Sequence, residues 1–446
     1  MIRSRVLLLA MVSMLTLADT TWGYDIATHR ELGLRAARSS SSLQSTVRDD
    51  LGFADAATTL FVGQIAEDWI RAGAGFEDVP FFRVLNHFHN PLNSWSEAGL
   101  RIGTPPRSIT GPSSVLWGQR TTQDSPDSDL ILGGGTWSWP FARTGFLTAL
   151  TDRDPGTREA AFAKTFRALG QLTHLVQDAS VPAHVRNDPH LSVPIFGRNI
   201  GDPDPYEEWV ERTRTRSPGL FNVILAGPTI LPNRFVFAPT GDVGAPSPIA
   251  GLIDTKTFLG LNPLLLSGVT IGIAEFTNGN FLSSDRLFHP DFLFPRLSSV
   301  DLQSPIVESE RGRVRRYFPK VDDGNGTPVA HFVAEGLLYE STLAARGAPL
   351  PMSFALQDRV HQDYAQILLP RAVGYSAALI DYFFRGKLDG DIVTDPNDSN
   401  PDIVRFSGTN ASPEALSGGT LLLYAENAAC IRTPLVALDA DVAVSA

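Results

Sequence analysis

Three residues in one short segment, His174, Asp178 and His184, have the types and spacing of metal ligands. On a helix, His174 and Asp178 project from one face, one turn apart. Pro182 ends such a helix and lets His184 approach from another direction. Imidazole and carboxylate are standard zinc ligands where thiolates are absent, and the single cysteine, Cys430, excludes a thiolate cage. The segment therefore predicts a zinc site.

A purely structural interpretation of the same segment is the alternative to the zinc site. It is a surface His–Asp pair that slightly stabilises a helix, with His184 unrelated to it. Three further features favour the metal. His174 lies close to the apolar stripe of its helix, where an unpaired imidazole is costly to bury. A second polar cluster comprises residues 77–78 and 86–89, and His29 stands near the start of the chain.

The segment that carries His174 is the clearest helix in the sequence, over residues 159–178. Its apolar residues recur at intervals of three and four, which indicates one buried face; they are Phe162, Phe166, Leu169, Leu172 and Val176. Gly170, in the middle of this helix, predicts a close approach of a second backbone.

The remaining pattern predicts a mainly α protein. Further helices are expected over residues 28–37, 55–73, 206–212, 272–281 and 361–384, the last one kinked or restarted at Pro370. Residues 92–135 are expected to form a loop or insertion. Alternating runs such as 421–424 and 435–444 predict a small β appendage over 391–446 that is an incomplete sandwich, after a helical domain over 24–390.

The N-terminus is typical of a signal peptide over residues 1–23. Arg3 and Arg5 precede an apolar run over 6–17, which is short for a membrane span, and cleavage is expected after Ala18 or after Gly23. A buried first helix is the alternative. Export predicts a secreted or periplasmic protein. A net charge of −11 excludes a broad basic surface, so no stable nucleic-acid partner is expected.

Three motifs resemble one superfamily, the bacterial zinc-dependent phospholipases C and the single-strand-specific zinc nucleases of fungi and plants. They are His-x-x-x-Asp-x-x-x-x-x-His at 174, 178 and 184, His-Phe-His-Asn-Pro at 87–91, and Tyr-Glu at 206–207. The resemblance covers about residues 24–385. It implies a mainly helical domain that holds up to three zinc ions.

By this resemblance, Asp78, His87 and His174 hold one zinc ion, and Asp178 bridges it to a neighbour. Glu77 and Asp68 compete with Asp78 for the carboxylate position. The second zinc ion of the family binds a histidine, here His29, together with the amino and carbonyl groups of the mature N-terminal residue. Cleavage after Gly23 makes that residue Tyr24; Trp22 is the alternative, and cleavage after Ala18 misplaces the amine.

The third zinc ion of the family implies His184 and Glu207 as ligands. Pro203 stands where the family has a histidine, so the sequence departs from the pattern there. Asp202, Asp204 and His190 are the candidate substitutes, and a shift of one residue would use Asp204 with Glu208.

The resemblance predicts an exported zinc-dependent phosphodiesterase that acts on phospholipid or another phosphate diester, with peripheral contact to a membrane. Clustered zinc ions offset the charge of the diester and activate a water for in-line attack. Asp178, or a free carboxylate such as Glu77, is expected to orient or deprotonate that water. The alternatives are a single-strand nuclease and a non-catalytic binding protein. His89 is expected to have a surface role or to be an outer-sphere or substrate group.

Overall fold

A computed structural model shows how the chain folds around the segments named above. It describes residues 24–53, 55, 58–103, 108–124, 129–131, 133–189, 192–195, 198–201, 203–230, 232, 248–256, 271–310, 312–321, 327–336, 353–394, 404–412 and 422–435. The predicted signal peptide and the candidate ligands His190 and Asp202 lie outside these residues.

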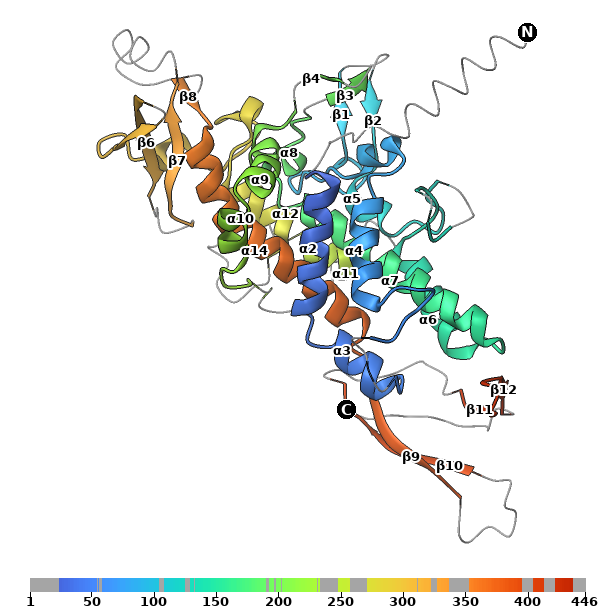
Figure 1. Cartoon of the computed structure of the whole chain (residues 1–446). Coiled ribbons are helices and arrows are strands. Elements are labelled where there is room, and N and C mark those ends of the chain that lie inside the picture. The colour runs from blue at the N-terminus through green and yellow to red at the C-terminus, as the bar shows by residue number, and fades with distance from the viewer. Residues whose placement is uncertain are drawn as a thin grey trace, which may run out of the picture.

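Four helices form the centre of the molecule, as Figure 1 shows. They are α2 (Ile26–Ser39), α4 (Ala66–Phe76), α7 (Pro155–Asp178) and α14 (Asp358–Phe383). Helix α7 packs against α2, α4 and α14, and every one of its residues from Thr165 to Asp178 is buried. The mainly α class is confirmed. A helix enclosed on several sides can carry polar groups into a dry interior, which is what the candidate site requires.

Helix α7 begins four residues before the predicted start because its first turn is capped. The side chain of Asp154 accepts a hydrogen bond from the Thr157 backbone nitrogen at 2.7 Å, and Pro155 occupies the first turn. The expected close backbone approach at Gly170 is confirmed. A Cβ at Gly170 would overlap the Ile70 carbonyl and lie 2.9 Å from the Cα of Gly73, so α4 packs closely on α7.

The other predicted helices are found with altered bounds. The segment predicted over 55–73 is helical only from Ala66, and α14 continues through Pro370 without a restart. The remaining helices are α3 (Leu43–Ser45), α5 (Ser114–Trp117), α6 (Trp139–Thr151), α8 (Pro182–Val185), α9 (Pro205–Arg216), α10 (Pro218–Leu225), α11 (Pro248–Ile253) and α12 (Ile273–Asn280). A π-helical turn covers Thr46–Asp50, and 3-10 turns cover Phe81–Asn86, Ser284–Arg286 and Leu297–Ser299.

A four-stranded antiparallel sheet lies within the predicted helical domain, in a stretch for which no individual element is predicted from the sequence. It runs in the order β5 (Ile306–Glu310), β6 (Arg313–Lys320), β7 (Val329–Glu335) and β8 (Phe354–Ala355), and β7 packs against α14. The sequence pattern did not indicate this sheet, because buried and exposed residues do not alternate regularly along β6. Its first two residues are exposed, Arg315 and Arg316 are half-buried, and the adjacent Tyr317 and Phe318 are both buried.

The remaining strands form small two-stranded pairs. They are β1 (Arg101–Ile102) with β2 (Ile109–Thr110), β3 (Ser192–Ile195) with β4 (Arg198–Gly201), β9 (Leu388–Thr394) with β10 (Val404–Asn410), and β11 (Tyr424–Glu426) with β12 (Arg432–Pro434). The predicted boundary at residue 391 falls inside β9. The hairpin of β9 and β10 projects from one end of the helices (Figure 1). Most of the strand predicted over 435–444 lies outside the described residues.

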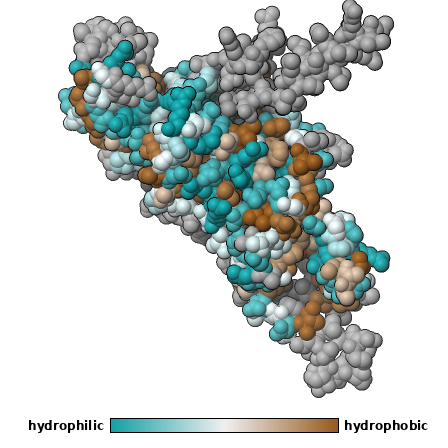
Figure 2. All heavy atoms as spheres, in the orientation of Figure 1, coloured by the Kyte–Doolittle hydropathy of each residue, from teal (hydrophilic) through white to brown (hydrophobic). Residues whose placement is uncertain are grey.

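Large exposed apolar side chains come from separate parts of the chain. Phe82, Ile131, Val223 and Val314 are each at least 70% exposed. On the face drawn in Figure 2, hydrophilic and hydrophobic residues are interspersed. Among the helices that the structure describes, none has the length and apolar character needed to cross a membrane.

The first turn of α14 buries a histidine whose neutral form is favoured by the fold. His361 is 3% exposed, and burial, aided by the charge of Arg212, lowers its pKa to about 3. The unfolded chain protonates this residue near pH 6.5, so its contribution to stability is present above that pH and is lost as the pH falls towards 3.

We therefore expect acid sensitivity from His361. From pH 6.5 to 4.5 the free energy of unfolding of the metal-free protein should fall by about 2 kcal/mol through this group alone. His361→Phe should lack that contribution. Urea unfolding of both proteins across this pH range measures the difference, and parallel curves for the two would contradict the assignment.

Candidate metal centre

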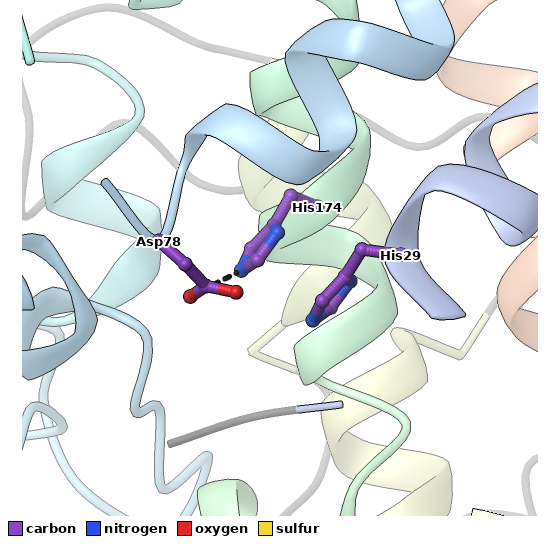
Figure 3. A group of neighbouring side chains, drawn as sticks. All are labelled: His29, Asp78 and His174. Atoms are coloured by element: carbon purple, nitrogen blue, oxygen red, sulfur yellow. Dashed lines mark ion pairs between the residues drawn. The ribbon is translucent and has the colours of Figure 1, made fainter. Parts of the chain in front are cut away.

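Side chains from three helices, from the turn after a fourth and from the end of a 3-10 turn meet in the buried interior. His29 comes from α2, Asp78 from the turn after α4, and His174 from α7, and Figure 3 shows these three facing one another. His87 follows the 3-10 turn Phe81–Asn86, and His184 lies on α8. Each of these side chains, and Asp178 with them, belongs to a residue that is at most 3% exposed. The structure thus brings six predicted ligands into one buried cluster.

Asp178 is the centre of this cluster. Its Oδ2 lies 2.9 Å from His87 Nδ1 and 3.0 Å from His174 Nε2. Its Oδ1 lies 3.3 Å from His29 Nε2, and His184 Nδ1 is 3.9 Å from Oδ2. One carboxylate therefore contacts imidazoles on both of its oxygens, an arrangement that would suit a ligand shared by two ions.

The structure separates Asp78 from its competitor Asp68. Asp78 Oδ1 lies 3.4 Å from His174 Nε2 and 3.6 Å from His87 Nδ1. The side chain of Asp68 is 45% exposed and faces Arg71 instead. Two overlapping groups have ligand atoms within 4.8 Å of one another: His29, Asp78 and His174 form one, and His87, His174 and Asp178 form the other.

Outer hydrogen bonds set the orientation of two imidazoles. His174 Nδ1 lies 2.7 Å from the carbonyl oxygen of Ala74, and His29 Nδ1 lies 2.7 Å from Gln177 Oε1. Both acceptors require a proton on Nδ1, so each ring in its neutral form would direct the lone pair of Nε2 to the centre of the cluster. The two rings also stack, with centroids 3.6 Å apart.

Glu77 is not the free carboxylate that the sequence suggested for activating water. Its Oε2 accepts a hydrogen bond from Arg83 at 2.7 Å, and its Oε1 accepts one from Trp117 Nε1 at 2.7 Å. Oε1 also lies 3.7 Å from His87 Nε2. Burial opposes ionisation, but the charge of Arg83 and contact with His87 lower the pKa of Glu77 to about 2. Glu77 is therefore an ionised support behind His87, because donors already occupy both oxygens.

The third predicted site contains two of its expected donors. His184 Nε2 lies 3.3 Å from Glu207 Oε1 on α9, which supports the Tyr-Glu register. The shifted register is wrong, because Glu208 is exposed and Asp204 caps α9 by accepting a hydrogen bond from the Glu207 backbone at 3.0 Å. Among the residues that the structure describes, no group of three donors that includes His184 forms within 4.8 Å.

Tyr24 lies beside His29, with its side chain committed to other partners. The residue is fully buried, and its hydroxyl is 3.1 Å from both Ser180 Oγ and the Tyr206 hydroxyl. Its ring meets the ring of His29 edge-on at 5.6 Å. The start of the described chain is thus fixed next to the centre. The expected main-chain ligation by Tyr24 stays a prediction.

The charges of the cluster favour cations at its centre. Burial opposes protonation, yet Asp178 and Asp78 raise the pKa of His174 well above its usual value. Burial likewise opposes protonation of His184, but Asp178 and Glu207 raise its pKa to about 9. The pKa of Asp178 is lowered well below its usual value; burial opposes this, and the surrounding histidines outweigh it. Protons therefore occupy the place that a dication would take.

Buried polar atoms that make no hydrogen bond of normal geometry, although several of them form ion-pair contacts, supply a test of fit for a metal. They include both oxygens of Asp178, Oδ1 of Asp78, Nε2 of His29 and Nδ1 of His184. Buried polar groups in proteins are nearly always satisfied, so this concentration calls for an explanation. Imidazole nitrogens and carboxylate oxygens in a thiolate-free cage match the preferences of zinc. The residues fit the predicted metal.

Several supporting residues were missed from the sequence. Gln177, Arg83 and Trp117 hold His29 or Glu77 by hydrogen bonds, and Gln171 Oε1 accepts one from Arg83 at 3.1 Å. Polar residues inside an otherwise buried helix were the available signal for the two glutamines. Among the residues that the structure describes, His89, His289, His331 and His361 also lie outside the two groups of candidate ligands.

Gln177 offers a direct test of this outer support. Gln177→Leu removes the acceptor of His29 Nδ1, so we expect zinc affinity to fall about 10- to 100-fold. Gln177→Glu keeps an acceptor at the same place and should retain most of the affinity. Competition titration with a zinc chelator measures both variants. Equal affinities in the Leu variant and the wild type would contradict a supporting role.

Comparison of the chain with protein-family models, with curated proteins and with solved structures gave no match. The geometry of the cluster therefore carries the functional argument.

Proposed function

We propose that this protein is an exported zinc-dependent phosphodiesterase that hydrolyses phospholipid head-group phosphoesters in the manner of a phospholipase C. The observation that carries the proposal is the buried cluster around Asp178, in which His29, His87 and His174 each place a ring nitrogen within 3.3 Å of its carboxylate. The helical architecture agrees with the scaffold that the sequence resembles.

Bound zinc would supply charge neutralisation of the diester and a water of lowered pKa. His29, Asp78, His87, His174, Asp178, His184 and Glu207 are the side chains that would hold it. Asp178 would bridge neighbouring ions because both of its oxygens contact imidazoles. His184 and Glu207 would hold a further ion. The backbone of Tyr24 would complete the site of His29 after export.

The charge balance of the cluster explains how an acidic protein can bind an anionic substrate. Asp78, Asp178 and Glu207 contribute three negative charges, and neutral imidazoles contribute none. Two or three dications would therefore leave a local charge of about +1 to +3 in a buried site. That charge attracts a phosphate diester even though the whole chain carries −11.

The choice of phospholipid over nucleic acid rests on the sequence. The His-Phe-x-Asn-Pro segment at 87–91 and the Tyr-Glu pair at 206–207 resemble the phospholipases C, and the single cysteine departs from the fungal nucleases. Peripheral membrane contact belongs to this choice. A single-strand nuclease of the same superfamily is the alternative that the test includes.

The test begins with elemental analysis of the purified protein, followed by turnover on a phosphatidylcholine emulsion and on single-stranded DNA. We expect two or three zinc ions per chain and activity on the emulsion. His174→Ala should lose both zinc and activity. Zinc with turnover of DNA alone would replace the phospholipase by the nuclease. A wild-type protein without zinc, or full turnover in His174→Ala, would overturn the proposal.

Export is tested by N-terminal sequencing of the secreted protein. A chain that starts at Tyr24 supports its role as a ligand, because its free amino group would then lie five residues before His29. A chain that starts at Asp19 would remove that ligand from the proposal.

A further inference from the structure

His89 belongs to a buried hydrogen-bond network next to the candidate metal centre. It is 1% exposed and points to Asp254, with 2.9 Å between His89 Nε2 and Asp254 Oδ2. Asp254 directly follows α11, and its nitrogen donates to the Ala250 carbonyl at 2.7 Å. The expectation of a surface role for His89 is therefore wrong. Histidine and aspartate form a buried pair between segments 165 positions apart.

The carboxylate of Asp254 is fixed by several donors. Oδ2 also accepts a hydrogen bond from Trp95 Nε1 at 2.8 Å and lies 2.9 Å from Lys256 Nζ. Oδ1 accepts a hydrogen bond from the backbone nitrogen of Lys256 at 2.8 Å. Burial opposes ionisation, but the bonds and charges of His89 and Lys256 lower the pKa of Asp254 to about 2. Asp254 is thus a rigid anionic acceptor for His89.

Three consecutive residues connect this acceptor to the metal centre. His87 contacts Asp178, the ring of Phe88 stacks on the ring of His184 with centroids 4.4 Å and planes 7° apart, and the His89 backbone nitrogen donates to the His184 carbonyl at 3.0 Å. The segment 87–89 therefore restrains both the ring and the backbone of His184. His89 is the residue that joins this segment to Asp254.

We propose that His89 and Asp254 are a positioning pair that holds His184, and the segment carrying His87, in the orientation needed to bind zinc. The inference rests on the proposed zinc function and extends it to two residues outside the ligand set. The Nε2–H group of His89 donates a hydrogen bond to Asp254. The His89 ring therefore restrains the backbone of segment 87–89. Hydrogen bonds of this kind orient ligands, and their loss lowers metal affinity about 10- to 100-fold.

A matched pair of variants separates positioning from general packing. His89→Phe keeps a ring and the backbone hydrogen bond to His184 but removes the donor to Asp254. His89→Gln places an amide nitrogen where Nε2 stood and restores a donor. We expect zinc affinity to fall about 10- to 100-fold in His89→Phe and to return close to the wild-type value in His89→Gln.

Two further variants test the acceptor. Asp254→Asn removes its charge and should lower zinc affinity about tenfold. Trp95→Phe removes another donor to the same oxygen while leaving His89 in place, and should keep the wild-type affinity. Circular dichroism of the metal-free proteins checks that each one folds, and chelator competition with Zn²⁺ alone measures affinity.

The outcomes distinguish this inference from the proposed function. A wild-type protein that binds no zinc overturns both. Wild-type affinity in His89→Phe, or equal losses in His89→Phe and His89→Gln, overturns the positioning pair and leaves the zinc function intact. If His89→Phe fails to fold, Asp254→Asn against Trp95→Phe decides, and equal affinities in these two overturn the pair.

Discussion

Replacing Asp178 with asparagine is expected to abolish zinc binding and to lower phosphodiesterase turnover by about a thousandfold or more. The carboxylate is fully buried and contacts His29, His87 and His174 through both oxygens. An amide of the same shape offers one neutral acceptor, so it can neither bridge two cations nor offset their charge.

The same substitution should also weaken the metal-free fold. Asp178 is the counter-charge for imidazoles such as His174, whose pKa it raises well above the usual value. Without it, a protonated ring stays buried and unpaired or must lose its proton, and the breaking of a buried pair costs about 3 to 5 kcal/mol. The loss should be largest between about pH 4 and 6.5, where Asp178 is ionised and the imidazoles of the unfolded chain are protonated, and should shrink as the pH falls through the lowered pKa of Asp178.

Elemental analysis, turnover on the preferred substrate, and urea unfolding with a chelator present measure these effects. Asp68→Asn is the matched control, because that carboxylate is 45% exposed and faces Arg71 outside the cluster. It should resemble the wild type in all three measurements. Retained zinc in Asp178→Asn would remove Asp178 from the ligand set.

Replacing Arg83 with methionine should produce the second large effect, a loss of about 3 to 5 kcal/mol in the free energy of unfolding. The Arg83 side chain is fully buried and donates to Glu77 at 2.7 Å, while its other nitrogen donates to the Gly135 carbonyl at 2.8 Å. Methionine fills similar space but leaves the carboxylate of Glu77 without its main counter-charge.

The pH dependence of this variant has a definite sign. In the wild type, Arg83 lowers the pKa of Glu77 to about 2 against the opposing effect of burial. Without Arg83, burial raises the pKa above the value in the unfolded chain. Stability is then kept below about pH 4.5 and lost as the pH rises through the new pKa. The cost of Arg83→Met should therefore be greater at pH 7 than at pH 4.

Urea unfolding at these two pH values tests the prediction. The double variant Arg83→Met with Glu77→Gln should recover part of the loss, because no charge remains buried. Arg48→Met is the control, since Arg48 forms an exposed pair with Asp49 and should show no measurable change. A loss in Arg83→Met that is the same at both pH values would contradict the role of the Glu77 charge.

The site follows from how α7 is packed. One helix carries His174 and Asp178 into the cluster, with Gln177 directed at His29 and Gln171 at Arg83. The close approach of α4 at Gly170 brings the Ala74 carbonyl within 2.7 Å of His174 Nδ1. A larger residue at Gly170 would therefore disturb an imidazole as well as a helix contact.

Part of this site could be predicted because helical spacing is a local property. The four-residue interval between His174 and Asp178 places them on one face whatever surrounds the helix. Pro182 indicated a break between this helix and His184; the structure ends α7 at Asp178 and places Pro182 in the first turn of α8. The scarcity of cysteine limits the donors to nitrogen and oxygen. The mainly α class follows from the same periodicity, since long amphipathic runs have few other structures.

Only the tertiary structure shows which carboxylates face the histidines of the candidate metal centre. Glu77 and Asp78 are neighbours in the chain, but Arg83 and Trp117 engage Glu77, while Asp78 faces His174. The sheet from β5 to β8 also escaped prediction, because its strand β6 has no clean alternation of buried and exposed residues.

The sequence by itself determined the types of the candidate ligands, the helix that carries two of them and the mainly α class, because these depend on neighbours a few residues apart. The partners of His89 and Glu77, the register of Glu207 and the convergence of His29 with Asp178 depended on the tertiary structure. Those contacts join residues far apart in the chain, and their geometry is fixed only when the helices pack and exclude water.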